Sequence, residues 1–146
     1  MFQLLLVFTF TLSFSQDLFI SEYSEGSSYN KYIEIYNPSS ASIDLSNYQI
    51  WKIGNGANTW EDAPNALSLD GIILPGEVFV ICHTSIDGSI SSSCDLLNGS
   101  QSMNFNGNDA VGLINNGEVI DTVGDDDGNP GAGWSVAGIA DATKDH

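Results

Sequence analysis

The chain has 146 residues, of which 42% are hydrophobic, so it is long and apolar enough to form one domain with a core. Its formal net charge is −16, because three lysines and no arginine stand against 19 acidic residues. Proteins bind nucleic acids and anionic membranes by neutralising phosphates with lysine and arginine, so this composition argues against direct binding of either. The same charge favours solubility and the attraction of divalent cations.

Residues 1–16 have the pattern of an export signal. Leu4 to Leu12 is a short, mainly apolar run, shorter than the ~20 residues of a membrane-spanning helix. Ser13 and Ser15 then supply small residues of the kind that a signal peptidase reads. Since no lysine or arginine follows Met1, a buried N-terminal strand is the alternative. We expect a mature chain over 17–146, without a membrane span, that is secreted or at the cell surface, with the periplasm as an alternative.

After this leader, short β-type runs alternate with turn residues, and no amphipathic helix is evident. A period of two in 31–36 is typical of a strand with one buried face. Asn116-Gly117 supplies the positive φ angles of a tight hairpin turn. Strands are predicted at 17–23, 31–36, 43–53 (in two pieces), within 66–73, at 77–82, at 110–114 and at 118–123. Such spacing predicts one all-β domain, an antiparallel β-sandwich or a barrel.

Cys82 and Cys94 are the only cysteines. An even pair in an exported chain predicts a disulfide, which would close a loop of about a dozen residues and contribute about 3 kcal/mol. Two free buried thiols are the alternative. A zinc site is disfavoured, because it would need four ligands and His83 directly follows Cys82.

Three segments occur in an informative order: Leu18–Tyr23 with Ile-Ser-Glu, Lys31–Pro38 with Glu-Ile-Tyr-Asn-Pro, and Ile43–Ile50 with Asp-Leu-Ser-x-Tyr. This order resembles the lamin tail domain as found in secreted bacterial proteins. Further matches are Leu74–Glu77, Asn106–Ala110, Ile120–Gly124, Gly133–Gly138 and Ala142–His146.

The resemblance implies an immunoglobulin-like β-sandwich over 17–146 and an accessory role in exported proteins that include nucleases and other hydrolases. No catalytic residues belong to the family pattern. Similar bacterial modules continue beyond the Lys-Asp-His end, so the end at His146 points to a domain truncated at its C-terminus. Within the motifs, Asn37 and Asp44 are expected to bond nearby backbone, and Leu45 and Ile50 to point inward.

An acidic loop near the C-terminus is a candidate calcium site. Asp125, Asp127 and Asn129 place oxygen atoms at alternate positions, and Gly128 allows a sharp turn. A solvated acidic turn is the alternative. No other cofactor is expected.

Aromatic side chains offer a second kind of candidate site. Trp60 lies in a polar connection and is the best candidate for stacking against a sugar or another ligand. Trp51 and Trp134 are expected to fill the core of the sandwich, where large aromatic side chains bury much area.

Catalytic machinery is not evident. The histidines are His83, expected at the surface at a strand end, and His146, and no Gly-x-Ser-x-Gly motif holds a nucleophile. We therefore expect that the chain is not an enzyme. We expect an extracellular or cell-surface interaction module, for protein binding or for a targeting or spacer role. The alternatives are a calcium-assisted carbohydrate-binding module and an accessory domain of a secreted nuclease or other hydrolase whose catalytic part lies outside this chain. The expected partner is a protein or a surface glycan.

Overall fold

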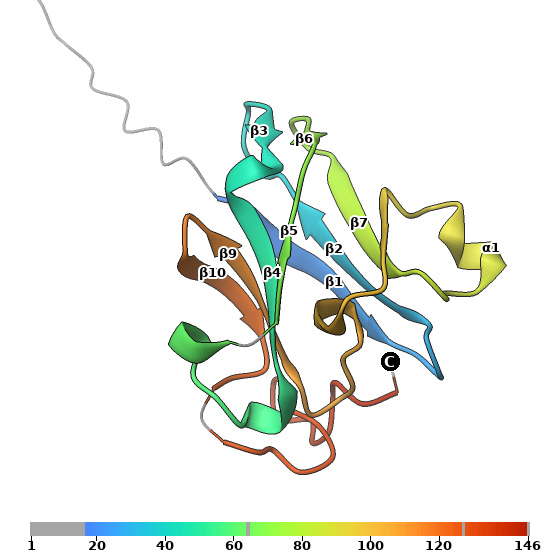
Figure 1. Cartoon of the computed structure of the whole chain (residues 1–146), viewed down its shortest axis with the longest axis vertical. Coiled ribbons are helices and arrows are strands. Elements are labelled where there is room, and N and C mark those ends of the chain that lie inside the picture. Colours follow the sequence, from blue (N-terminus) through green and yellow to red (C-terminus); the bar gives the residue numbers. More distant parts are fainter. Residues whose placement is uncertain (1–16, 64, 127, 146) are drawn as a thin grey trace, which may run out of the picture.

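The computed structural model describes residues 17–63, 65–126 and 128–145, and these form two facing four-stranded sheets (Figure 1). The first sheet has the order β1 (Phe19–Glu25), β2 (Lys31–Tyr36), β7 (Val78–His83), β8 (Leu96–Asn98). The second has the order β10 (Glu118–Val123), β9 (Ala110–Asn115), β4 (Tyr48–Ile53), β5 (Asn65–Ser68). A small antiparallel pair, β3 (Ile43–Asp44) and β6 (Ile72–Ile73), lies at one end.

All strand pairs in the two sheets are antiparallel except β7 and β8, which are parallel. The helical elements of the described residues are short: α1 (Gly88–Ser91) and the 3₁₀ turns η1 (Leu45–Asn47), η2 (Gly54–Gly56), η3 (Trp60–Asp62) and η4 (Gln101–Met103). The prediction of an all-β antiparallel sandwich is therefore confirmed, with an arrangement consistent with an immunoglobulin-like fold.

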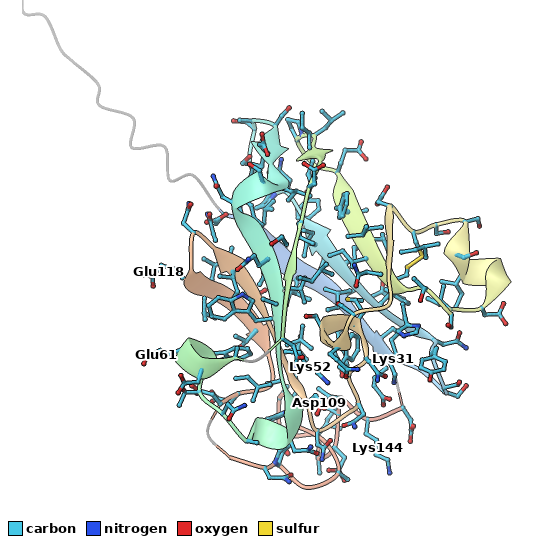
Figure 2. All side chains as sticks on the ribbon, in the orientation of Figure 1. Lys31, Lys52, Glu61, Asp109, Glu118 and Lys144 are labelled. Carbon is cyan, nitrogen blue, oxygen red and sulfur yellow. A yellow bond between two sulfur atoms is a disulfide. The ribbon has the colours of Figure 1, made fainter. Side chains whose placement is uncertain are left out.

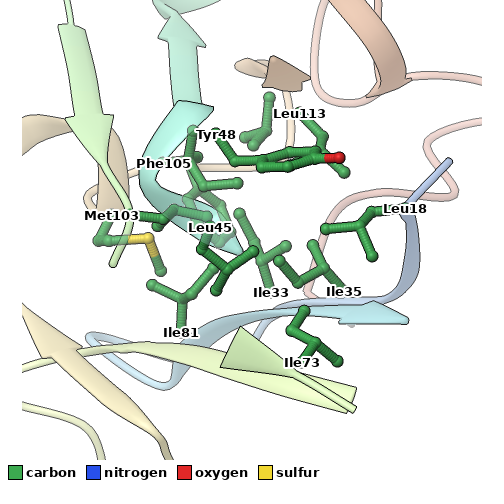
Figure 3. Packing of buried hydrophobic residues seen from close by; sticks show 13 residues of the cluster. Leu18, Ile33, Ile35, Leu45, Tyr48, Ile73, Ile81, Met103, Phe105 and Leu113 are labelled. Carbon is green, nitrogen blue, oxygen red and sulfur yellow. The ribbon is translucent and has the colours of Figure 1, made fainter. Parts of the chain in front are cut away.

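The core lies between the two sheets (Figure 3). In β2 every second side chain points inward, so Ile33 and Ile35 are fully buried, and in β9 Leu113 meets them from the other sheet. Met103, which ends η4, and Phe105, which follows it, fill the interior next to them. Removing such side chains from water stabilises the fold by roughly 1.5–3 kcal/mol each. Leu45 and Ile50, predicted to point inward, are also fully buried in this core.

The predicted motif residue Asn37 is fully buried just after β2. Its amide Nδ2 donates to the carbonyls of Ala41 at 2.8 Å, Ile73 at 3.1 Å and Leu74 at 3.2 Å, and its Oδ1 accepts from Ser39. One side chain thus ties the end of β2 to β6. Its expected role as a turn former is confirmed.

Asp44 shows the same behaviour at the start of η1. Its carboxylate accepts from the Ser46 amide at 2.8 Å, and this hydrogen bond holds the pKa of Asp44 below its ordinary value. The prediction that Asp44 bonds nearby backbone is likewise confirmed.

A disulfide joins Cys82, near the end of β7, to Cys94, just before β8, with the Cα atoms 5.9 Å apart. The loop that it closes carries α1, whose first turn is capped by Asp87. Because β8 pairs with β7 in parallel, the chain must cross over between them, and the disulfide fixes this crossover to the strand that it leaves.

On one side of the sandwich, edge strands of the two sheets meet. Both β1 and β10 carry an irregularity in register, between Ile20 and Glu22 and between Val119 and Asp121. At this point the Ile20 amide donates to the Asp121 carboxylate at 2.8 Å. A side chain of one sheet therefore satisfies an edge amide of the other and closes the sandwich there.

Among the described residues, no helix is long and apolar enough to cross a bilayer. The predicted signal at 1–16 lies outside the described residues.

Candidate functional site

Trp51 lies on the outer face of the second sheet. Side chains alternate along β4, so that Tyr48 and Ile50 enter the core while Trp51 points away from it and is half-buried. Its indole Nε1 donates to Gln49 at 2.8 Å, on the same face. The expectation that Trp51 fills the core is wrong.

Trp134 is also outside the core cluster. It lies in the segment after β10, half-buried, where its indole Nε1 donates to the Asp109 carbonyl at 3.1 Å and its ring contacts Gly124. The indole of Trp134 thus ties the C-terminal segment to the start of β9, and the core prediction is wrong for this residue as well.

Trp60 lies over the same outer face as Trp51. Its indole ring rests on Gly112 of β9, whose missing side chain makes room for it. Gly112 is in turn the cross-strand partner of Trp51. The two tryptophans, nine positions apart and in different elements, are therefore brought to one hollow.

This hollow has a volume of about 490 Å³ and is lined by Trp51, Trp60, Glu61, Gly117, Glu118 and Val119. We call it the tryptophan hollow. Glu61 belongs to η3 and Glu118 begins β10 directly after the Asn116-Gly117 turn, and both side chains project from the same side of the molecule (Figure 2). Both are exposed, and no hydrogen bond or ion pair from the described residues reaches either carboxylate.

Most other acidic side chains in the described chain have a structural partner. They accept backbone amides, bind hydroxyl groups or pair with lysine: Asp17, Glu22, Glu25, Glu34, Asp44, Asp87, Asp95, Asp109, Asp121 and Asp126. The carboxylates of Glu61 and Glu118 differ from these because their charge is available at the rim of an aromatic hollow.

The predicted calcium loop contacts the segment that carries Trp60. Asp126, which sequence reasoning had not singled out, accepts the Trp60 amide through Oδ2 at 3.2 Å. Gly56 and Gly128 meet so closely that a β-carbon on Gly56 would collide with the Gly128 carbonyl. The acidic loop therefore helps to hold the segment that carries Trp60.

Two of the predicted calcium ligands, Asp125 and Asn129, accept hydrogen bonds from nearby backbone amides. Asp125 accepts the next amide, that of Asp126, and Asn129 accepts the Gly131 amide. Asp127 lies outside the described residues. Among the described residues, no three His, Cys, Asp or Glu side chains come together as metal ligands. Calcium binding by Asp125, Asp127 and Asn129 stays a prediction.

Two of the three lysines are buried in ion pairs. Lys31 is 5% exposed and its Nζ lies 2.6 Å from Glu25; Lys52 is 8% exposed and its Nζ lies 3.5 Å from Asp109. Lys144, near the C-terminus, is exposed (Figure 2). The surface therefore has far less positive charge than even this composition suggests.

His83 lies at the end of β7, as expected, but it is buried and not at the surface. Its ring stacks on Tyr29 with centroids 4.5 Å apart, and its Nδ1 accepts the Ser85 amide at 3.0 Å. Burial, with a smaller effect of nearby Lys31, lowers the pKa of His83 below its ordinary value. His83 is buried, and not at the surface as expected, because Tyr29 of the β1–β2 turn covers its ring.

Comparison with protein families gives a match to the model described as the Lamin Tail Domain, over residues 13–127. The matched range contains every strand from β1 to β10, including both sides of the tryptophan hollow. No curated protein matches the chain.

Proposed function

We propose that this chain, which belongs to the lamin tail domain family, is a non-catalytic interaction module that works outside the cytoplasm. The family is one of immunoglobulin-like domains, and its match covers all the strands of the sandwich. A protein-binding or targeting role fits a module whose polar side chains are mostly used to hold its own turns and edges.

The tryptophan hollow is the observation that carries this proposal. The core is complete without Trp51 and Trp60, yet the fold places both on one face, and Gly112 makes room for one of them. Large aromatic side chains that stay partly exposed are enriched where proteins bind partners. The face of the second sheet is therefore a better binding surface than its β10 edge, where an irregular register makes a poor template for an added strand.

Export is supported by two independent features. The chain has a disulfide, which persists in oxidising compartments and is rare in the cytosol. Its first sixteen residues have the pattern of a signal peptide. Mass spectrometry of the exported chain should give an N-terminus near Gln16 and no free thiol. Intact Met1 or free thiols would contradict the extracellular part of the proposal.

The interaction itself can be tested with the full chain as bait in its native surroundings. A specific partner should be retained by the wild type and lost by the double variant Trp51→Ala, Trp60→Ala. The matched control is Glu77→Gln, which changes an exposed carboxylate just before β7 of the other sheet and should retain the partner. Equal capture by all three baits would contradict binding through the tryptophan hollow.

Carbohydrate binding is the second candidate, because two indole rings that line one hollow suit the apolar faces of a sugar. Calcium-assisted carbohydrate binding would also require the acidic loop to bind calcium. Millimolar calcium should then raise the melting temperature, and Asp125→Ala should abolish the rise, since a ligand that binds the folded state stabilises it. The role of accessory domain to a nuclease or other hydrolase is a further proposal that the family membership supports.

A further inference from the structure

The tryptophan hollow combines two features that suit a cation. Trp51 and Trp60 offer aromatic faces, which attract an ammonium or guanidinium group placed over the ring. Glu61 and Glu118 add two carboxylates with no partner among the described residues. Arginine pairs with a carboxylate through planar, paired hydrogen bonds and also stacks on indole, so it can use both features at once.

The charge of the whole chain points the same way. The formal net charge is −16, and Lys31 and Lys52 are buried and neutralised by Glu25 and Asp109. The exposed Lys144 comes from the C-terminal segment, which does not line the hollow. A basic partner is therefore attracted from a distance, whereas a neutral sugar would gain nothing from this field.

We propose that the tryptophan hollow binds an arginine or lysine side chain of a basic protein segment, with the indoles of Trp51 and Trp60 against the cation and the carboxylates of Glu61 and Glu118 beside it. This rests on the proposed interaction function and names the chemistry of its partner. The volume of about 490 Å³ is ample for one long cationic side chain and part of its backbone.

The test uses the full chain with its three tryptophans labelled with ¹⁵N at the indole nitrogen. The probe is the peptide Gly-Arg-Gly-Arg-Gly, and its citrulline counterpart is the neutral control of nearly the same shape. We expect the arginine peptide to shift the indole signals of Trp51 and Trp60 and to leave Trp134 unmoved. The citrulline peptide should shift none of them.

Charge variants then assign the contacts. Glu61→Gln with Glu118→Gln should weaken binding of the arginine peptide by about tenfold, and raised salt should weaken it further. Glu77→Gln, which removes one exposed carboxylate elsewhere, should weaken it much less. All three positions are exposed, so the variants are expected to fold, and their melting curves verify this.

Three outcomes overturn the inference: no indole shift at millimolar peptide, equal shifts with citrulline, or unchanged affinity in the double glutamine variant. A shift of Trp51 and Trp60 by neutral oligosaccharides alone would assign the hollow to a glycan, and the interaction module would stand. If the native partner also bound the Trp51→Ala, Trp60→Ala variant, the proposed function of this face would itself fail.

Discussion

Gly112, in β9, lies so close beneath the Trp60 indole that a β-carbon on it would be 3.0 Å from Cζ3 and 3.2 Å from Cη2. Glycine weakens a strand and is common where another group must approach its backbone. The position of Trp60 in the tryptophan hollow therefore depends on an absent side chain in a different element.

This contact predicts that Gly112→Val destabilises the wild type but stabilises the Trp60→Ala variant. In the wild type, Gly112→Val should lower the melting temperature and shift Trp60 fluorescence, because the added side chain displaces the indole. In Trp60→Ala, the same substitution should stabilise the strand by about 0.5–1 kcal/mol, since valine suits a strand better than glycine. Urea unfolding of the four chains gives the coupling, and additive effects would contradict the contact.

Asp126 is predicted to act through Trp60 and not through a metal. Asp126→Ala removes the acceptor for the Trp60 amide and should cost about 1 kcal/mol of unfolding free energy. It should also change Trp60 fluorescence in buffer that contains a chelator. Asp62→Ala, two residues after Trp60 and exposed, is the matched control and should have little effect. An effect of Asp126→Ala that appears only with calcium present would contradict this role.

Substitution of Asn37 is predicted to destabilise the fold more than substitution of most other polar residues. Asn37→Ala leaves the carbonyls of Ala41, Ile73 and Leu74 without this donor, and should lower the free energy of unfolding by roughly 2–4 kcal/mol. Asn37→Asp keeps the shape but replaces the donating amide with an acceptor, so it should not rescue. Ser39→Ala, which loses only the hydroxyl contacts, should cost less. Equilibrium denaturation compares all three.

The lowered pKa of His83 predicts that the folded chain loses stability in mild acid. Its folded pKa lies below the ordinary value of 6.5, so the unfolded chain binds the proton more tightly. Its contribution is therefore fully present above about pH 6.5 and is lost as the pH falls toward the lowered folded pKa. Urea midpoints should fall between pH 7.5 and 5.5 in the wild type and less steeply in His83→Gln. Parallel curves would rule out this linkage.

The sequence was sufficient to predict those strands whose pattern depends on neighbouring residues alone. Alternation over 31–36 and the Asn116-Gly117 turn both specify strands through neighbouring residues, and β2, β9 and β10 formed as expected. The parallel pairing of β8 with β7 had no such signal, because it depends on the crossover through the disulfide loop.

The candidate site was predicted only in part. Trp60 was chosen for its polar surroundings, but its neighbours come from afar: Gly112 and Asp126 follow it by more than fifty positions. Trp51 could have been placed, since the period of two that buries Ile50 must turn Trp51 outward. Glu118 offered no signal, because it reaches the hollow through the long-range pairing of β9 with β4, which no local pattern predicts.

The buried lysines have a consequence for the resistance of the folded protein to proteases. Trypsin-like proteases cut after lysine and arginine, and this chain has no arginine. Lys31 and Lys52 lie within strands, nearly inaccessible and paired, so a protease cannot draw the backbone around them into its cleft without unfolding a sheet. The folded chain therefore offers such enzymes one exposed lysine, Lys144, two residues from its end, where a cut would leave both sheets whole.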